Sequence, residues 1–265
     1  MQGTAGGACA HQELTMATVK RTKVIAHRGG RRWAPENTMA AFRRSLEAGV
    51  DGIELDVQRC ASGEIVVFHD SDIGRTTNGV GRVADISYAE LRRLSAGLWF
   101  DPQFRGEYVP LLQEVLDLLN GRLLLNIEIK NAPVEYPGIE EDVLELLQDY
   151  PYRDKIIISS FDHELLLKIH AHSPDLSLGL LADALFVDLA AYAKRLGTTF
   201  WHPCYESLRA QAVQDAHQAG IQVYAWTMNS AREWSDGLSM GLDGIITDDP
   251  AALMQFLDRV AKVTR

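Results

Sequence analysis

Short apolar runs alternate along the chain with longer stretches in which apolar residues recur at helical spacing. Apolar runs bounded by turn residues are typical of buried strands. They predict strands over residues 23–26, 52–57, 123–129, 156–159, 178–181, 199–201, 221–226 and 244–247. The stretches between them predict helices over residues 37–48, 138–150, 162–172, 185–196, 206–219, 231–240 and 251–263. Glycines follow four of these stretches directly and predict left-handed helix ends, at Gly49, Gly197, Gly220 and Gly241.

Strands that alternate with helices are the signature of repeated βαβ units and a parallel sheet. Eight such units in 265 residues fit a (β/α)₈ TIM barrel, because these barrels commonly run to about 250 residues as one domain. A doubly wound open sheet is the alternative. Such sheets usually have fewer strands and often a glycine-rich phosphate turn, and the chain contains neither a GxGxxG nor a Walker sequence.

One segment interrupts this alternation. Residues 62–110 contain an additional apolar run at 64–68, a glycine-rich turn at 78–81 and a short helical pattern at 88–94. We interpret this segment as a small insertion after the second strand. Loops at that end of a barrel carry functional residues, so we expect the insertion to shape access to a site.

The sequence predicts a barrel domain over residues 23–265, preceded by a tail. Residues 1–22 are small or polar, which predicts disorder, and they lack the apolar core of a secretory signal. Met16 is a candidate start, and an origin of the preceding residues in a vector is the alternative. Whether residues 1–15 belong to the native protein therefore stays open.

The composition is that of an ordinary soluble protein, with 46% hydrophobic and 23% charged residues. The net charge of −10 argues against a nucleic-acid partner and against stable association with anionic membranes. No stretch approaches the ~18 apolar residues of a spanning helix. A small anionic ligand is compatible, because a local cationic or metal site overrides the overall charge.

The three cysteines, Cys9, Cys60 and Cys204, are scattered and form no CxxC pair. They predict free thiols in a reducing compartment, and hence a cytoplasmic protein. The sequence gives no prediction of the oligomeric state.

Two predicted strands carry polar side chains on a face that the fold would bury. Side chains alternate between the two faces of a strand. In the second strand the apolar residues take one face, while Glu54 and Asp56 take the face inside the barrel. In the third strand Asn126, Glu128 and Lys130 take the inner face in the same way. If both strands belong to one barrel, three carboxylates and a lysine meet near its C-terminal mouth.

Clustered buried carboxylates need a cation, because each loses its hydration and repels the others. Hard divalent ions prefer carboxylate and water oxygens. Glu54, Asp56 and Glu128 therefore predict a site for one divalent cation, Mg²⁺ or Ca²⁺, with Mn²⁺ as a third candidate. The alternative is a structural ion pair between Lys130 and Glu128, since such buried pairs are often close to neutral for stability. Recurrence of the pattern on two strands favours the metal site.

Two histidines stand where a predicted strand meets a loop. His27 ends the first strand and precedes Arg28, and His69 ends the run at 64–68 and precedes Asp70. Histidine titrates near neutral pH, so a pair beside a carboxylate cluster is predicted to act as general acid and base. Arg28 offers a planar guanidinium for a phosphate or a carboxylate.

Other polar positions leave two interpretations open. Asn37 is predicted to begin the following helix as its N-cap, and Glu36 beside it could reach the site. Asp248 and Asp249 precede Pro250, and a role in capping the last helix is favoured for them.

The remaining candidates are aromatic residues and one thiol. Trp99 and Phe100 of the insertion either fill its core or cover the pocket, with equal weight. Trp201 and His202 end the sixth strand and face either the pocket or the core. Cys204 has no base partner in the sequence, so a catalytic thiol is not expected.

From about residue 23 to the C-terminus the chain resembles the glycerophosphodiester phosphodiesterase family, through motifs that occur in the family's order. They are His27-Arg28-Gly29, Pro35-Glu36-Asn37-Thr38, Gly52-Ile53-Glu54-Leu55-Asp56-Val57, His69-Asp70, Arg75-Thr76-Thr77-Asn78-Gly79, Asn126-Ile127-Glu128-Ile129-Lys130, Ser159-Ser160-Phe161, Trp226-Thr227-Met228-Asn229 and Gly244-Ile245-Ile246-Thr247-Asp248. Each motif is weak alone, and the set is specific. Residues 71–74 depart from the family, in which many members carry Thr and Leu, and Asp72 there could affect entry of the leaving group.

The resemblance implies a cytosolic, bacterial-type (β/α)₈ enzyme that hydrolyses glycerophosphodiesters, such as glycerophosphocholine or glycerophosphoethanolamine, to sn-glycerol 3-phosphate and an alcohol. It also implies a role for each matching position. These roles are metal ligation by Glu54, Asp56 and Glu128, base and acid catalysis by His27 and His69, phosphoryl binding by Arg28 and Lys130, and an apolar glycerol wall from Phe161 and Trp226. The nucleophile, water or the glycerol 2-hydroxyl by way of a cyclic phosphate, stays open.

The residue chemistry is compatible with other functions as well. A related barrel phosphodiesterase could act on a lysophospholipid or sphingolipid headgroup, but it would need a membrane anchor or an apolar rim. A sugar-isomerase-type metal barrel would use the carboxylates without needing Arg28 and Lys130. A barrel that only binds its ligand is disfavoured, because none of the expected polar positions is lost.

Overall fold

A closed barrel of eight parallel strands forms the centre of the molecule, in a computed structural model that describes residues 21–263. Neighbouring strands follow the order β1-β9-β8-β7-β6-β5-β4-β2, and pairing between β1 and β2 closes the barrel. The predicted (β/α)₈ fold is therefore confirmed, and the open-sheet alternative is wrong. The barrel strands are β1 (Lys23–Ala26), β2 (Gly52–Arg59), β4 (Leu124–Ile129), β5 (Ile156–Ser160), β6 (Ser177–Ala182), β7 (Phe200–Pro203), β8 (Gln222–Ala225) and β9 (Gly244–Thr247).

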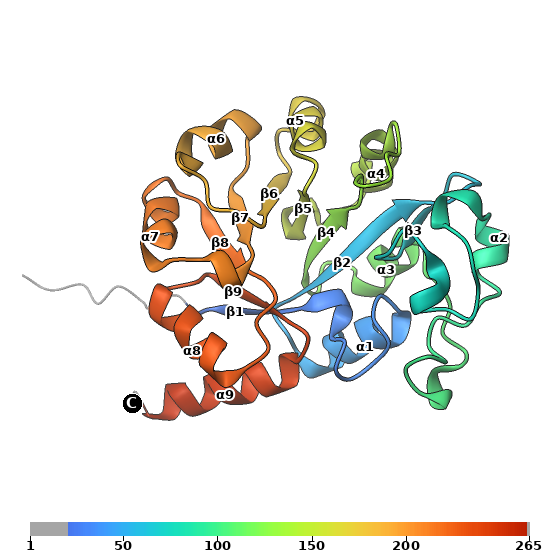
Figure 1. The fold of residues 1–265 in the computed structure, drawn as a ribbon, viewed down its shortest axis with the longest axis horizontal. Coiled ribbons are helices and arrows are strands. Elements are labelled where there is room, and N and C mark those ends of the chain that lie inside the picture. The colour runs from blue at the N-terminus through green and yellow to red at the C-terminus, as the bar shows by residue number, and fades with distance from the viewer. Residues whose placement is uncertain (1–20, 264–265) are drawn as a thin grey trace, which may run out of the picture.

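Helices surround the barrel on its outside (Figure 1). The outward-facing apolar side chains of the strands pack against the apolar faces of these helices in one continuous core. Inside the barrel a second apolar cluster comprises Ile25, Ile157, Phe200, Tyr224 and Ile246. The helices around the barrel are α1 (Met39–Ala48), α3 (Leu112–Leu119), α4 (Ile139–Gln148), α5 (His163–His172), α6 (Leu189–Leu196), α7 (Ala210–Gln218), α8 (Ala231–Met240) and α9 (Pro250–Val263).

The register between β2 and β4 brings the predicted polar faces together. Glu54 lies opposite Asn126, and Asp56 lies opposite Glu128. The apolar residues between them on β2 are fully buried on the opposite face. The prediction that these carboxylates share the interior of one barrel is confirmed.

The start of α1 differs from the prediction. Thr38 is the N-cap, because its side chain accepts a hydrogen bond from the backbone N–H of Ala41, and the cap predicted at Asn37 is wrong. Asn37 instead has a positive φ of 56°, a conformation that Asn tolerates better than most residues. Its side-chain amide donates to Asp56 over 2.8 Å. Thr is also a favourable N-cap residue. With Thr38 in that role, the side chain of Asn37 binds the site carboxylate Asp56 instead.

Helix α3 was not among the predicted helices, and two others begin later than predicted. Helix α3 has only eight residues, and the three-residue turn Asn120-Gly121-Arg122 is all that separates its leucines from those of the next strand, which obscures the change from helical to strand periodicity. Helix α6 begins at Leu189 behind the side-chain cap of Asp188. Helix α7 begins at Ala210, because a separate 3₁₀ turn forms over Tyr205–Ser207.

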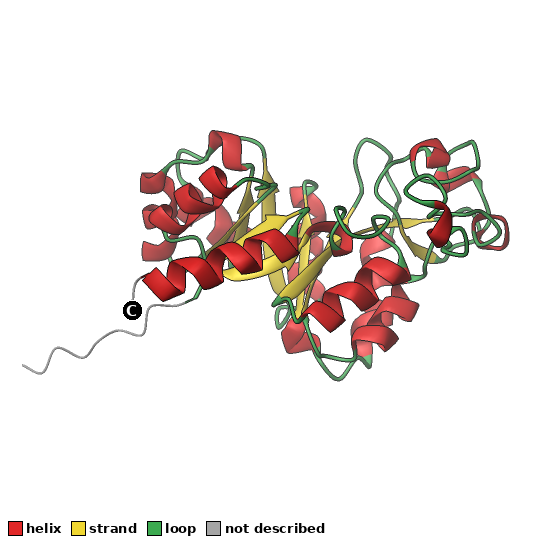
Figure 2. Ribbon diagram, turned by 90° about the horizontal axis from the view of Figure 1, so that it is seen from below, coloured by secondary structure: helices red, strands yellow, loops and turns green. Residues whose placement is uncertain are grey.

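The insertion lies to one side of the barrel, next to the end of β2 (Figures 1 and 2). Strand β3 (Ile65–Val67) pairs antiparallel with the last residues of β2, and α2 (Tyr88–Leu91) follows after two 3₁₀ turns. Its apolar residues form a core of their own, which comprises Cys60, Val66, Phe68, Ile73, Val83, Leu91, Ala96 and Val109. The insertion is therefore a small packed unit attached to the barrel.

Trp99, Phe100, Trp201 and His202, each of which had two predicted positions, do not line the cavity at the barrel mouth. Trp201 is 1% exposed and His202 is 0% exposed, and burial lowers the pKa of His202 to about 3. His202 stacks on the ring of Tyr224 inside the barrel. Trp99 is exposed on the insertion and makes an edge contact with Phe100, so neither of the two roles considered for this pair is observed.

Across residues 21–263, none of the helices has both the length and the apolar character needed to cross a membrane. Cys60 and Cys204 are free thiols. Cys9 and most of the tail predicted over residues 1–22 lie outside the described residues. The cytoplasmic location stays a prediction.

Candidate active site

A cavity of about 320 Å³ opens at the C-terminal mouth of the barrel. This volume suits a small-molecule ligand. Its walls contain every predicted site residue except Asp56, which lies directly behind them in contact with Arg28 and Lys130. The lining residues are His27, Arg28, Arg31, Glu54, His69, Asn126, Glu128, Lys130, Phe161, Leu181, Trp226, Thr227 and Ile246.

Glu54, Asp56 and Glu128 bring carboxylate oxygens within 4.8 Å of one another, and all three residues are buried. Burial, together with the neighbouring carboxylates, raises the pKa of Glu54 well above its usual range. Burial also raises the pKa of Glu128 to about 7, although Lys130 opposes this. Glu54 Oε1 has no hydrogen-bond partner among the described residues. Buried carboxylates left short of positive charge are the donor set that a hard divalent cation satisfies.

Asp56 is the best supported of the three carboxylates. Lys130 Nζ lies 3.1 Å from one oxygen and Arg28 Nε lies 3.4 Å from the other. Burial alone would raise the pKa of Asp56, but these two cations outweigh burial and hold it well below the usual range. Lys130 also contacts Glu128, as the structural alternative predicted. That pair leaves Glu54 without a cationic side-chain partner at its free oxygen, so a structural ion pair does not account for the cluster.

The backbone at Arg28 explains the sequence His27-Arg28-Gly29. Arg28 adopts a left-handed conformation with φ of 50°, and its backbone N–H donates to Glu54 Oε2 over 2.9 Å. Gly29 must follow, because a Cβ there would lie 2.8 Å from the Cβ of Ala41. The turn thus directs the Arg28 side chain toward Asp56 while packing against α1.

His27, directly after β1, is held by Asp248, which follows the neighbouring strand β9. Its Nδ1 lies 2.6 Å from Asp248 Oδ1, and an ionised carboxylate can only accept, so Nδ1 carries the proton. The other ring nitrogen, Nε2, lies 3.9 Å from Glu54. Burial lowers the pKa of His27, while the hydrogen bond to Asp248 opposes that shift. The ring is therefore neutral at pH 7, with Nε2 free to accept a proton.

A role in capping the last helix was favoured for Asp248 and Asp249, but Asp248 does not cap it. Asp249 fills that role by accepting from the backbone N–H of Ala252 over 3.0 Å. Asp248 instead holds His27, and Asn229 Nδ2 donates to its second oxygen over 3.0 Å. The parallel pairing of β1 with β9 brings these segments together.

His69 is held by its sequence neighbour. Its Nδ1 lies 2.6 Å from Asp70 Oδ1, which again places the proton on Nδ1. Burial lowers the pKa of His69, and the negative charge of Asp56 opposes that shift. Arg75 donates to both oxygens of Asp70. Burial opposes this effect, but the hydrogen bonds from Arg75 and His69 lower the pKa of Asp70 to about 2.

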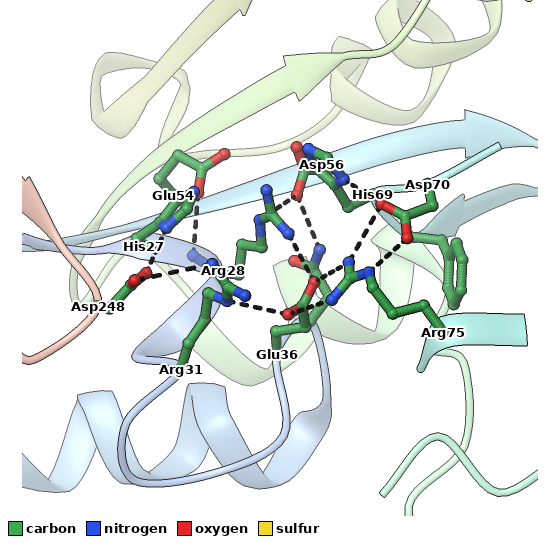
Figure 3. Close-up of polar contacts among 12 residues, drawn as sticks. His27, Arg28, Arg31, Glu36, Glu54, Asp56, His69, Asp70, Arg75 and Asp248 are labelled. Carbon is green, nitrogen blue, oxygen red and sulfur yellow. Dashed lines mark hydrogen bonds and ion pairs between the residues drawn. The ribbon is translucent and has the colours of Figure 1, made fainter. Parts of the chain in front are cut away.

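Behind the cavity, three arginines converge on one buried carboxylate (Figure 3). Glu36 is 4% exposed and accepts from Arg28, Arg31 and Arg75 over 2.6–3.0 Å. Burial would raise its pKa, but the arginines lower it to about 2. Glu36 therefore supports the site from behind. Arg31, Arg75 and the Asp70 carboxylate were not predicted to have a role, although all three occur in or beside the motifs.

The opposite wall of the cavity is apolar. The rings of Phe161 and Trp226 meet edge to face, with centroids 5.7 Å apart. Leu181 and Ile246 are further apolar residues that line the cavity. The cavity thus places an ionic face opposite an apolar one, an arrangement that suits a ligand with a charged group at one end.

Comparison with known proteins identifies the family. Residues 27–252 match the glycerophosphoryl diester phosphodiesterase family. The chain belongs to this family. It is 41% identical to a glycerophosphodiester phosphodiesterase of Caldanaerobacter subterraneus, over 89% of this chain and 98% of the relative. It is 37% identical to one of Bacillus altitudinis, over 91% and 98% respectively. Membership makes the chain a phosphoric diester hydrolase.

Solved structures agree with this assignment. A phosphodiesterase of Oleispira antarctica in complex with the product sn-glycerol-3-phosphate has a TM-score of 0.83 and 30% identity, covering 89% of this chain and 96% of that one. A glycerophosphodiester phosphodiesterase of Agrobacterium tumefaciens has a TM-score of 0.76 and 28% identity, covering 90% and 100%. The barrel is therefore the fold of this family.

Proposed function

We propose that the chain hydrolyses small glycerophosphodiesters, such as glycerophosphocholine and glycerophosphoethanolamine, to sn-glycerol 3-phosphate and an alcohol. The observation that carries this proposal is the pair His27 and His69, which line one cavity beside a buried carboxylate cluster. Each is held at Nδ1 by its own carboxylate, so each presents Nε2 for proton transfer. The product complex of the Oleispira antarctica relative supports the identity of the phosphate product.

The residues present fit one divalent cation. Glu54, Asp56 and Glu128 would hold it through carboxylate oxygens, and the unpartnered Oε1 of Glu54 supports this assignment. Mg²⁺, Ca²⁺ and Mn²⁺ all accept such ligands. The bound cation would neutralise charge on the phosphoryl oxygens.

His27 acts as the general base and His69 as the general acid. The neutral ring of His27 accepts the proton of the nucleophile, which is water or the glycerol 2-hydroxyl of the substrate. Burial lowers the pKa of His69 as well, so the active form is the fraction of the protein in which His69 is protonated. In that form His69 donates to the oxygen of the departing alcohol, which would otherwise leave as a poorly stabilised alkoxide. Each proton transfer contributes roughly 10²–10⁴-fold in rate.

Substrate binding follows from the two faces of the cavity. Arg28 and Lys130 provide fixed positive charge for the phosphoryl oxygens, where negative charge grows during attack. Phe161 and Trp226 offer an apolar wall to the carbon side of the glycerol. The expected partner of the chain is this small-molecule substrate, without stable membrane association and without nucleic acid.

Release of glycerol 3-phosphate from glycerophosphocholine tests the proposal. The purified protein is treated with EDTA, then supplied with Mg²⁺, Ca²⁺ or Mn²⁺, and the product is detected with glycerol-3-phosphate dehydrogenase. We expect release to return with metal and to be lost in His27→Ala and in Glu54→Ala, both checked for folding by circular dichroism.

Three other outcomes are informative. No release by the folded, metal-supplied protein contradicts the proposal and directs the search to lysophospholipid or sphingolipid headgroups. Release of phosphocholine and glycerol contradicts the bond assigned. Release of choline with a cyclic glycerophosphate, and without glycerol 3-phosphate, identifies the glycerol 2-hydroxyl as the nucleophile.

A further inference from the structure

Arg75 joins two carboxylates that lie on different parts of the molecule. Its Nε donates to Asp70 Oδ2 over 2.5 Å and its Nη2 to Asp70 Oδ1 over 3.1 Å. The same guanidinium donates to Glu36 over 2.7 and 3.0 Å. Asp70 and Arg75 belong to the insertion, whereas Glu36 lies on the loop between β1 and α1 of the barrel. A planar guanidinium that makes paired hydrogen bonds to two carboxylates fixes both in orientation.

We propose that Arg75 is a positioning residue for His69: it fixes Asp70, and through Asp70 the imidazole ring, against the buried carboxylate of Glu36. This inference rests on the proposed function, in which His69 is the acid. Arg75 itself does not line the cavity, so it acts through Asp70 rather than on the substrate.

The backbone around His69 is fixed separately from its side chain. Gln58 Nε2 donates to the carbonyl oxygens of Phe68, His69 and Asp70 over 2.8–3.1 Å. These bonds hold the loop but leave the side-chain torsions of His69 free. The ring is 29% exposed and Asp70 is 28% exposed, so solvent competes for their hydrogen bond. Arg75 restricts Asp70 and thereby the ring.

Glu36 gives Arg75 a fixed point on the barrel. It is almost fully buried and also accepts from Arg28 and Arg31 (Figure 3). Arg28 contacts Asp56, and Arg31 lies 3.7 Å from Asp248. Glu36 thus connects Arg75, which supports His69, with Arg28 beside the carboxylate cluster and with Arg31 near the partner of His27.

The dependence of the rate on the leaving group separates positioning of the acid from a structural role. Two esters of glycerol 3-phosphate serve as substrates, one of choline and one of 4-nitrophenol. Departing choline needs a proton, whereas 4-nitrophenolate is stable and leaves without one. Loss of acid positioning therefore slows the choline ester selectively, while damage to the fold or to the metal site slows both.

We expect Arg75→Met to lower kcat on the choline ester on the order of 10²-fold, the loss typical of a displaced catalytic group. kcat on the nitrophenyl ester should change little, and KM should stay similar for both esters. His69→Ala should show the same selectivity with a larger loss. Asp70→Asn should resemble Arg75→Met, and the double variant should be no slower than the slower single variant, because both act through one contact. Arg75→Lys should recover part of the loss.

Arg82→Met is the matched control, because Arg82 pairs with Asp85 on the exposed surface of the same insertion. It should leave both rates unchanged. Equal losses on the two esters in Arg75→Met, or no loss on either, overturn the inference while the wild-type activity upholds the proposed function. A His69→Ala variant without selectivity overturns the inference, because His69 is then not the acid. A folded, metal-supplied wild type that hydrolyses neither ester overturns the proposed function and the inference together.

Discussion

The two histidines of the site are supported by different parts of the molecule. His27 is 13% exposed and hydrogen-bonds to Asp248, which follows the last strand of the barrel. His69 is 29% exposed and hydrogen-bonds to Asp70, which Arg75 of the insertion holds. One support is built from barrel strands that the whole fold stabilises, and the other from a small unit packed on its own core.

This difference indicates that the barrel supports the proposed base and the insertion supports the proposed acid. The proposed base is held by Asp248 after the last barrel strand, and the carboxylates of the cluster lie on barrel strands. The proposed acid depends on the insertion, and its alignment with the barrel depends on contacts such as Arg75 with Glu36. Changes to the insertion should therefore alter proton donation to the leaving group before they alter binding of the phosphate.

The largest expected effect is the loss of kcat on removing either histidine, and its dependence on the leaving group should differ between the two. His27→Ala should lower kcat by roughly 10²–10⁴-fold on both the choline and the 4-nitrophenyl ester of glycerol 3-phosphate, because the nucleophile must be deprotonated in either case. This loss contrasts with the selective loss expected for His69→Ala. Glycerol 3-phosphate release under saturating substrate measures both. Near-normal hydrolysis of the nitrophenyl ester by His27→Ala would contradict its assignment as the base.

The sequence predicted the barrel and its polar mouth because both follow from local patterns. Strands and helices repeat with distinct periods, and carboxylates at alternating positions of a strand must share a face. Glu54, Asp56 and Glu128 were therefore predicted to meet, and they do. Helix α3 was missed because it is short and only Asn120, Gly121 and Arg122 separate its leucines from those that lead into β4.

The supports of the histidines were harder to predict, because a carboxylate at a strand end looks the same whether it caps a helix or holds a side chain. Asp248 and Asp249 are adjacent, yet only Asp249 caps α9. Barrel closure, which places the last strand beside the first, was the available signal that Asp248 could reach His27. The pairing of Arg75 with Glu36 joins residues 39 positions apart and has no such periodic signal.

An intermediate effect concerns the carboxylate that links the two regions. Glu36→Gln should lower the free energy of unfolding by roughly 3 kcal/mol at pH 7, because a pKa lowered from 4.5 to about 2 corresponds to that much interaction. The substitution also leaves Arg28, Arg31 and Arg75 without their shared anion. Urea denaturation of the two proteins measures the difference.

The pH dependence of that difference is a further check. A lowered pKa means that the stabilisation is complete above the ordinary value near 4.5 and is lost as the pH falls through about 2. The gap between wild type and Glu36→Gln should therefore persist at pH 5 and shrink toward pH 2. Arg82→Met, which breaks an exposed pair, should change the free energy of unfolding little, because solvent screens such pairs. A Glu36→Gln protein as stable as Arg82→Met would show that the arginines do not depend on this carboxylate.

The smallest effect is a shift in the pH profile that differs between the two histidines. Burial lowers the pKa of His27 below its ordinary 6.5, and a base must be neutral, so kcat/KM should fall only as the pH drops below that value. This acid limb should appear with both esters. The hydrogen bond to Asp248 opposes the burial effect, so Asp248→Asn should move the limb to still lower pH.

His69 should behave in the opposite way, because an acid must be protonated. Burial lowers the pKa of His69 below its ordinary 6.5, so kcat/KM for the choline ester should fall as the pH rises through that lowered value. This alkaline limb should be absent with the nitrophenyl ester, which needs no proton. Asp70 raises the pKa of His69 through its hydrogen bond, so Asp70→Asn should move the alkaline limb to lower pH and leave the acid limb in place. Profiles of kcat/KM for both esters, from about pH 4 to pH 9, report these groups in the free enzyme. If Asp70→Asn shifts the acid limb instead, the proton donor is supported by the barrel rather than by the insertion, and the assignment of the two histidines is reversed.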